Sequence, residues 1–175
     1  MLSKEELTDI DKEIKKFPHP KNACLDALMA VQKHRNYISD ETLKDVAVYL
    51  GMSATELDGI ATFYNLIYRK PVGACVIRLC DSVSCWIMGY PDVKKRISEK
   101  LSIDWGESTA DKKYTLLPAQ CLGTCDRAPA MMINDKLYRN LTPDRVEAIL
   151  NSYDKEGDNN DSTPHQSHAR VDAAP

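Results

Sequence analysis

The sequence predicts a protein of the mixed α+β (α/β) class, with an N-terminal helical bundle followed by a small α/β domain. Up to about residue 68, apolar residues recur at helical spacing behind serine caps. After Pro71-Val72-Gly73, short apolar runs alternate with amphipathic stretches in the order β-α-β-β-α, which is typical of helices packed on a small sheet. We therefore expect a bundle over 1–70, a second domain over 71–153, and a disordered acidic tail over 154–175.

Four short helices are expected in the bundle. Two Ser-x-x-Glu capping boxes, at Ser3 and at Ser53, mark the starts of the first and the fourth. The second begins after Pro20, and Asp40 is the expected cap of the third, which Gly51 ends. Short helices cannot each bury an apolar stripe alone, so we expect the four to pack together.

The second domain begins with a buried strand over 75–79, and a second strand follows over 114–117. Between them, directly after Cys85, lies a helical stretch that reaches residue 101. A hairpin over 131–138 comes next, with an Asn-Asp turn at its centre. Thr142 then caps a last helix that has proline at its first position.

Charge and hydropathy restrict the possible functions. The 175 residues include 23 bases and 26 acids, a net charge of −3. Residues 154–175 hold five of the acids and two of the bases, so the body of the chain is neutral. A neutral body favours a component of an assembly over a nucleic-acid-binding protein, which needs a basic face. No run approaches the ~20 apolar residues of a membrane span, and no secretion or mitochondrial targeting signal is visible at the start. A bacterial cytoplasmic protein, or an already processed organellar one, is therefore expected.

Four of the six cysteines form two pairs, each following a predicted strand. The first pair is Cys80-x4-Cys85, and the second is Cys121-x3-Cys125. Neighbouring strands of an α/β sheet bring their following loops to one edge, so four thiolates can converge there. A cluster on four thiolates is anionic and needs N–H donors. The helix expected directly after Cys85 can supply them, and Gly123 lets the second loop bend toward the sulfurs.

Three kinds of site fit a cysteine-rich chain without a secretion signal. Structural zinc usually takes C-x2-C in each knuckle, so spacings of x4 and x3 favour a two-iron cluster over zinc without excluding it. A thiol oxidoreductase would want C-x-x-C at a helix start. Cys24 and Cys75 fall on apolar faces and are expected to be core thiols. No serine–histidine constellation and no glycine-rich nucleotide loop is visible, so we expect no stand-alone catalytic site.

Hydrogen bonds to the sulfurs and burial adjust the potential of a bound cluster. The candidate residues for this role are Ser84, beside one of the cysteines, Gly123, and Pro129 with Ala130 in the turn after the second pair.

Three stretches carry a resemblance to a known family: GIATFYNLIYRKPVG at 59–73, IRLCDSVSCWIMG at 77–89 and LLPAQCLGTCDRAPAMMIND at 116–135. Through them the chain resembles the thioredoxin-like [2Fe–2S] ferredoxin family over about residues 5–153. The likeness is to the members that serve bacterial respiratory complex I, the NADH:quinone oxidoreductase. The resemblance implies a thioredoxin-like domain after the bundle.

The resemblance also implies that Cys80, Cys85, Cys121 and Cys125 hold one [2Fe–2S] cluster that exchanges single electrons with FMN. The FMN and NADH would be bound by a partner subunit, with the large iron–sulfur subunit as a second neighbour. The expected position is peripheral, on the inner face of the bacterial cell membrane, without membrane insertion or nucleic acid. Related chains serve NAD-linked hydrogenases and formate dehydrogenases, so the host complex stays open at this point.

Overall fold

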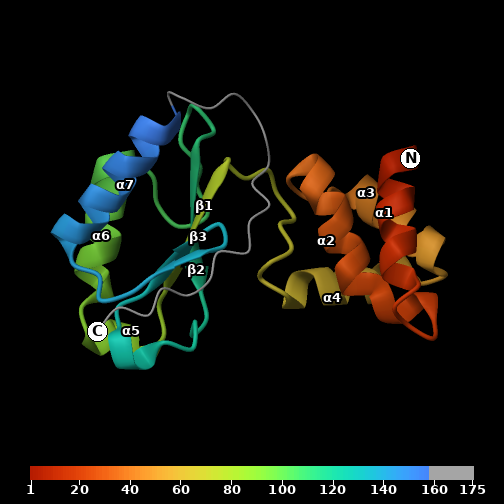
Figure 1. Cartoon of the computed structure of the whole chain (residues 1–175), viewed down its shortest axis with the longest axis horizontal. Helices are drawn as coiled ribbons and strands as arrows, with labels where there is room; N and C mark the ends of the chain where they lie inside the picture. The colour runs from red at the N-terminus through yellow and green to blue at the C-terminus, as the bar shows by residue number, and fades with distance from the viewer. Residues whose placement is uncertain (158–175) are drawn as a thin grey trace. The chain divides into compact units, whose positions relative to one another are not determined.

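The computed structural model describes residues 1–157 and divides into two compact units, with the boundary between Val72 and Gly73 (Figure 1). Each unit has its own hydrophobic core. In the described part of the chain, no helix is both long enough and apolar enough to cross a membrane.

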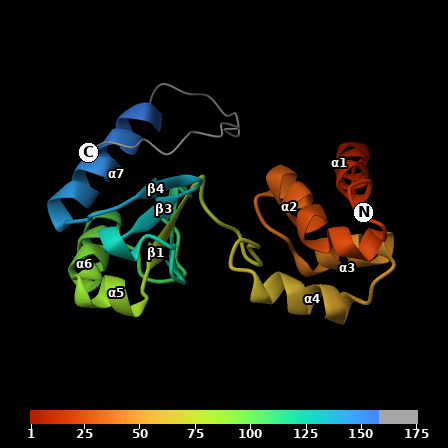
Figure 2. The same cartoon turned by 60° about the horizontal axis from the view of Figure 1, so that its bottom comes forward.

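The first unit is a bundle of four α-helices with one short 3₁₀ turn (Figure 2). Its elements are α1 (Lys4–Ile14), η1 (Pro20–Ala23), α2 (Cys24–Arg35), α3 (Asp40–Leu50) and α4 (Ala54–Phe63). Helical spacing turns one apolar stripe of each α-helix inward. The fully buried residues at the centre include Ile10, Leu28, Val31, Val46 and Leu57.

Most of the helix ends follow from local sequence. Both predicted capping boxes are present, and Gly51 ends α3 with a positive φ of 67°. The prediction that Asp40 caps α3 is wrong by one residue. Ser39 is the cap, because its backbone is extended and its hydroxyl accepts the Thr42 N–H. Asp40 is already helical, and its carboxylate pairs with Arg69 at 2.6 Å.

A buried carboxylate ties three of these helices together. Glu6 on α1 accepts hydrogen bonds from the Nε of Arg35 at 2.5 Å and from its second terminal nitrogen at 2.8 Å. Arg35, the last residue of α2, also donates to the Thr42 hydroxyl of α3 at 2.8 Å. These hydrogen bonds with Arg35 hold the pKa of Glu6 below its ordinary value of 4.5.

We expect Glu6→Gln to lower the free energy of unfolding by about 2 kcal/mol, because it removes the charge that Arg35 pairs with inside the bundle. Glu13→Gln on the same helix is the control, because its partner Lys16 is largely exposed. Urea unfolding followed by ellipticity at 222 nm measures both variants. The lowered pKa gives the parent a stabilisation that is full above pH 4.5 and is lost as the pH falls through the folded pKa. Equal losses in the two variants would contradict the role of Glu6.

The second unit is a four-stranded sheet with helices packed on it. Its elements are β1 (Cys75–Cys80), α5 (Val83–Ile87), α6 (Tyr90–Leu101), β2 (Tyr114–Ala119), η2 (Cys125–Arg127), β3 (Met131–Ile133), β4 (Lys136–Tyr138) and α7 (Pro143–Gly157). The strand order is β2-β1-β3-β4, with β1 and β2 parallel and the other pairs antiparallel. Side chains from β1, α6 and α7 share one core, so both long helices cover the same face of the sheet (Figure 2).

Three expectations for this unit are corrected. The single helix expected after Cys85 is two helices, because Gly89 has a φ of 92° and separates α5 from α6. In addition, α5 begins after Ser82, so Cys85 lies inside that helix instead of ahead of one. The predicted strand over 114–117 extends to Ala119 through Pro118, which is tolerated because β2 is an edge strand.

The last helix also runs further than the sequence predicts. The predicted tail starts at residue 154, yet α7 continues to Gly157. The carboxylate of Asp154 accepts a hydrogen bond from the Tyr114 hydroxyl at 2.8 Å and pairs with Lys113 at 3.1 Å. Burial, together with that carboxylate, raises the pKa of Tyr114. Residue 154 therefore belongs to the folded unit, and the rest of the expected tail, residues 158–175, lies outside the described residues.

Candidate metal centre

The two strands that precede the cysteine pairs end side by side. Cys80, the last residue of β1, is paired in parallel register with Ala119, the last residue of β2. The chain then leaves β1 into the turn that leads to α5, and leaves β2 into the loop that holds Cys121. The expectation that these strands are neighbours is confirmed, and their following loops start from one edge of the sheet.

The four thiols meet at this edge as two pairs. The Sγ atoms of Cys121 and Cys125 lie 3.2 Å apart, and the thiols of Cys80 and Cys85 are hydrogen-bonded to each other. The pairs are also close enough for Cys125 to interact electrostatically with both Cys80 and Cys85. Cys80 and Cys85 are 1% and 3% exposed, whereas Cys121 and Cys125 are exposed. The site therefore has a buried side and a solvent-facing side.

Backbone and hydroxyl donors point at three of the sulfurs. The Gly123 N–H lies 3.4 Å from the Sγ of Cys121, in a loop where Gly123 has a φ of 75°. The Ala130 N–H donates to Cys85, and the hydroxyl of Ser84 donates to Cys125. Donors of this kind stabilise a negative charge on sulfur, which an anionic metal centre requires.

Ala130 is held between the two residues of the buried pair. Its N–H donates to Cys85, and its carbonyl accepts the Cys80 N–H at 3.1 Å. The preceding peptide, Ala128–Pro129, is cis, and Ala128 packs against the same two cysteines. The carbonyl of Pro129 accepts the Leu141 N–H at 3.1 Å. Because proline has no backbone N–H, Ala130 is the donor from this turn.

Burial and the hydrogen bond with Cys80 raise the pKa of Cys85 to about 11. The Gly123 N–H, with a smaller effect from Cys125, holds the pKa of Cys121 below its ordinary value, and Cys121 in turn raises the pKa of Cys125. Metals bind thiolates, so a metal entering this site displaces protons, most readily from Cys121.

The donor set fits a two-iron centre. Four thiols and three aimed donors are present, and sulfur-bound iron clusters of the [2Fe–2S] type take four cysteines, two for each iron. Within residues 1–157, no three His, Cys, Asp or Glu side chains gather closely enough to hold one metal ion. Cys24 and Cys75 are partly buried and pack against the two hydrophobic cores, away from this group.

The sequence model of one protein family, described as thioredoxin-like [2Fe-2S] ferredoxin, matches residues 10–154 of the chain. The chain belongs to the thioredoxin-like [2Fe–2S] ferredoxin family. Members similar to it are named as one component of NADH-quinone oxidoreductase, the subunit designated E. The protein from Pseudomonas aeruginosa is 41% identical over 153 residues, covering 87% of this chain and 92% of the relative. The protein from Escherichia coli (strain K12) is 41% identical over 152 residues, with the same two coverages.

A solved structure of an NAD+-reducing [NiFe]-hydrogenase in the air-oxidised state is also similar to this ferredoxin-family chain. The TM-score is 0.62 at 22% identity, and the match covers 74% of this chain. The chain spans 23% of the hydrogenase chain, so the likeness is to one part of a longer polypeptide. At this identity the match shows a shared fold.

Sequence reasoning finds the four cysteines and the neighbouring residues Ser84, Gly123 and Ala130. It also predicts the contribution of Gly123, which bends its loop so that a backbone N–H faces a sulfur. The sequence predicts that a helix beginning directly after Cys85 supplies N–H donors to the site. That cysteine instead lies inside α5, and its donor, Ala130, comes from the turn before β3. Forty-five positions separate these two residues in the sequence, and no local pattern connects them.

Proposed function

We propose that the chain is the [2Fe–2S] electron-transfer subunit of an NADH-oxidising module of the respiratory complex I type. In this proposal Cys80, Cys85, Cys121 and Cys125 are the ligands of one cluster. Single electrons pass between that site and FMN, which a partner subunit binds together with NADH. The convergence of the four thiols at one sheet edge is the observation that carries the proposal.

The residues of the chain have two tasks in this function. The buried pair, with Ala130 between its members, fixes the inner side of the site against β1. The exposed pair brings the other side to the surface, where a partner can approach it. A cluster bound there supplies the one-electron redox chemistry, and the Ser84, Gly123 and Ala130 donors adjust its potential.

The extent of the similarity to each kind of protein decides which host complex we propose. The relatives whose names place them in NADH-quinone oxidoreductase are 41% identical and are covered over 92% of their length. The hydrogenase is 22% identical and is covered over 23% of its chain. The first likeness extends over nearly a whole protein, so a complex I subunit is the proposal, and the equivalent part of an NAD-linked hydrogenase is second.

The chain would act as a subunit of an oxidoreductase and translocase without binding NADH itself. Its proposed neighbours are the FMN- and NADH-binding subunit and the large iron–sulfur subunit. Its proposed place is the inner, cytoplasmic face of the bacterial membrane, as a peripheral part of the complex. The neutral charge of residues 1–153 is consistent with a protein that lies inside an assembly.

Cys121→Ala tests the ligand assignment. We expect the variant to lose most of its iron, because one iron would keep a single thiolate, while the bundle stays folded on its own core. Cys24→Ala is the matched control, since that cysteine packs in the other unit, and it should keep the full iron content. Iron and sulfide per chain after anaerobic purification measure both variants. A Cys121→Ala protein with undiminished iron would show that the assignment is wrong.

Ser84→Ala tests whether the hydroxyl adjusts the potential. A hydrogen bond to a ligand sulfur favours the more negative, reduced form, so its removal should lower the reduction potential by tens of millivolts. Ser82→Ala is the control, because Ser82 caps α5 without a side-chain hydrogen bond to it. A redox titration followed by electron paramagnetic resonance gives both potentials. Equal potentials in Ser84→Ala and the parent contradict this role of Ser84.

A further inference from the structure

Two side chains of the loop between β2 and η2 turn inward, and one of them is apolar. The loop forms neither helix nor strand, and its other residues are exposed. Thr124 is 8% exposed, and Leu122 is half-buried. The side chain of Leu122 packs against the buried cluster formed by Cys80, Cys85 and Ala128. This leucine therefore joins the loop of the exposed cysteine pair to the buried pair.

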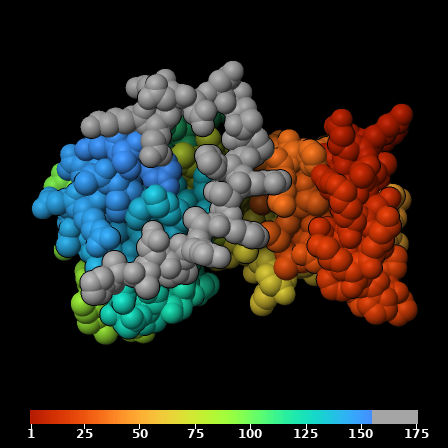
Figure 3. All heavy atoms as spheres, viewed as in Figure 1, coloured from red at the N-terminus to blue at the C-terminus, as the bar shows by residue number. Residues whose placement is uncertain are grey.

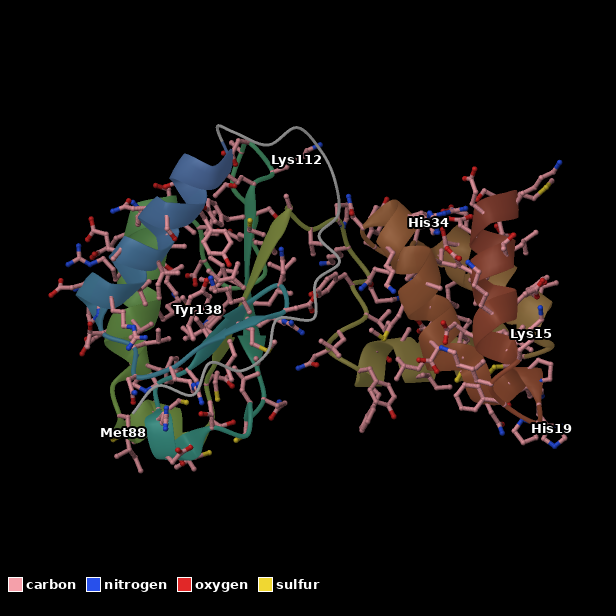
Figure 4. The ribbon with its side chains drawn as sticks, in the orientation of Figure 1. Lys15, His19, His34, Met88, Lys112 and Tyr138 are labelled. Carbon is pink, nitrogen blue, oxygen red and sulfur yellow. The ribbon has the colours of Figure 1, made fainter. Side chains whose placement is uncertain are left out.

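The apolar cover of the buried pair comes from three parts of the chain. Ala128 belongs to the turn after η2, Tyr90 begins α6, and Leu122 comes from the loop that holds the exposed Cys121. Tyr90 also packs in the main core of the second unit, which fixes its position. In Figure 3 the green spheres of α5 adjoin the teal spheres of the segment after β2, and Figure 4 shows Met88, the residue after α5, at this end of the unit. Leu122 is thus the part of the cover that moves with the exposed loop.

Water near the sulfurs changes the potential of an iron–sulfur centre. Reduction adds one negative charge to a centre that is already anionic on four thiolates, and water stabilises the added charge better than an apolar side chain does. Cys80 and Cys85 are 1% and 3% exposed, so the intact cover keeps water away from the inner sulfurs. A gap in the cover should therefore favour the reduced form and raise the reduction potential.

We propose that Leu122 is a positioning residue, which holds the loop of the exposed pair against the buried pair and excludes water from the inner side of the site. The inference rests on the proposed function, because it takes the four cysteines to hold one [2Fe–2S] centre. Leu122 is half-buried at the boundary with solvent, so its truncation opens a gap that water enters. The expected consequences are a higher reduction potential and a faster escape of iron.

The test is Leu122→Ala in the full chain with its iron, purified anaerobically. We expect the one-electron reduction equilibrium to shift about threefold toward the reduced form, a rise of roughly 28 mV, because a tenfold change corresponds to about 59 mV for one electron. Iron release to an excess of a ferrous-iron chelator should be about tenfold faster, because the loop of the exposed pair loses its apolar contact. A redox titration followed by electron paramagnetic resonance gives the potential, and the absorbance of the iron chelate gives the release rate.

Two control variants separate this role from a general loss of stability. Val83→Ala truncates an apolar side chain of α5 that is 70% exposed and lies two positions before Cys85, so the potential and the release rate should stay those of the parent. Leu122→Met refills the same space with a side chain of similar volume and should restore both values. The shift in Leu122→Ala is also opposite in sign to the one expected for Ser84→Ala, so the same disturbance cannot account for both.

The possible results separate this inference from the proposed function. A Leu122→Ala protein with full iron, a raised potential and faster release supports it. Full iron with the potential of the parent overturns it, whatever the release rate. If the alanine variant holds no iron, Leu122→Val, which removes a single methylene, takes its place: a smaller rise in potential supports the inference, and an unchanged potential overturns it. A parent that contains no iron overturns the proposed function, and the role of Leu122 with it.

Discussion

The candidate site depends on one backbone interaction, the parallel pairing of β1 with β2. This ladder places Cys80 opposite Ala119, so that both strands end at one edge of the sheet. The 35 residues between the two cysteine pairs include the whole of α6, which packs on the sheet face and returns the chain to that edge. Two pairs that are distant in sequence are thereby brought together within the second unit.

The two cysteine pairs have different surroundings, and this difference connects the fold with the proposed function. Cys80 and Cys85 are buried and fixed by Ala130, which bonds both of them. Cys121 and Cys125 are exposed, and short local donors from Gly123 and Ser84 serve them. One side of the site is therefore anchored in the core, and the other meets the surface beside the apolar residues of α5. Such an arrangement suits a cofactor that is held firmly and yet exchanges electrons with another chain.

The sequence predicts the features that depend on near neighbours and misses several that depend on distant ones. Serine capping boxes, the Gly51 helix end and the Thr142 cap are local, and the structure confirms them. The break at Gly89 is missed, because apolar residues continue at helical spacing on both sides of it. The extension of α7 past Asp154 depends on Tyr114 and Lys113, some forty residues away, and the donor to Cys85 comes from the turn at Ala130. Contacts between residues this far apart in the sequence depend on the tertiary fold.

The number of electrons that the anaerobically purified full chain accepts decides whether the four cysteines hold a [2Fe–2S] centre. A stoichiometric titration with a one-electron reductant, followed by visible absorbance and electron paramagnetic resonance, gives that number. A [2Fe–2S] centre on the four cysteines takes up one electron per chain and becomes paramagnetic. Uptake of two electrons without a paramagnetic signal would identify a dithiol–disulfide couple, and no uptake with one bound zinc would identify a structural metal site. Either of those results would show that the four cysteines do not hold a [2Fe–2S] centre.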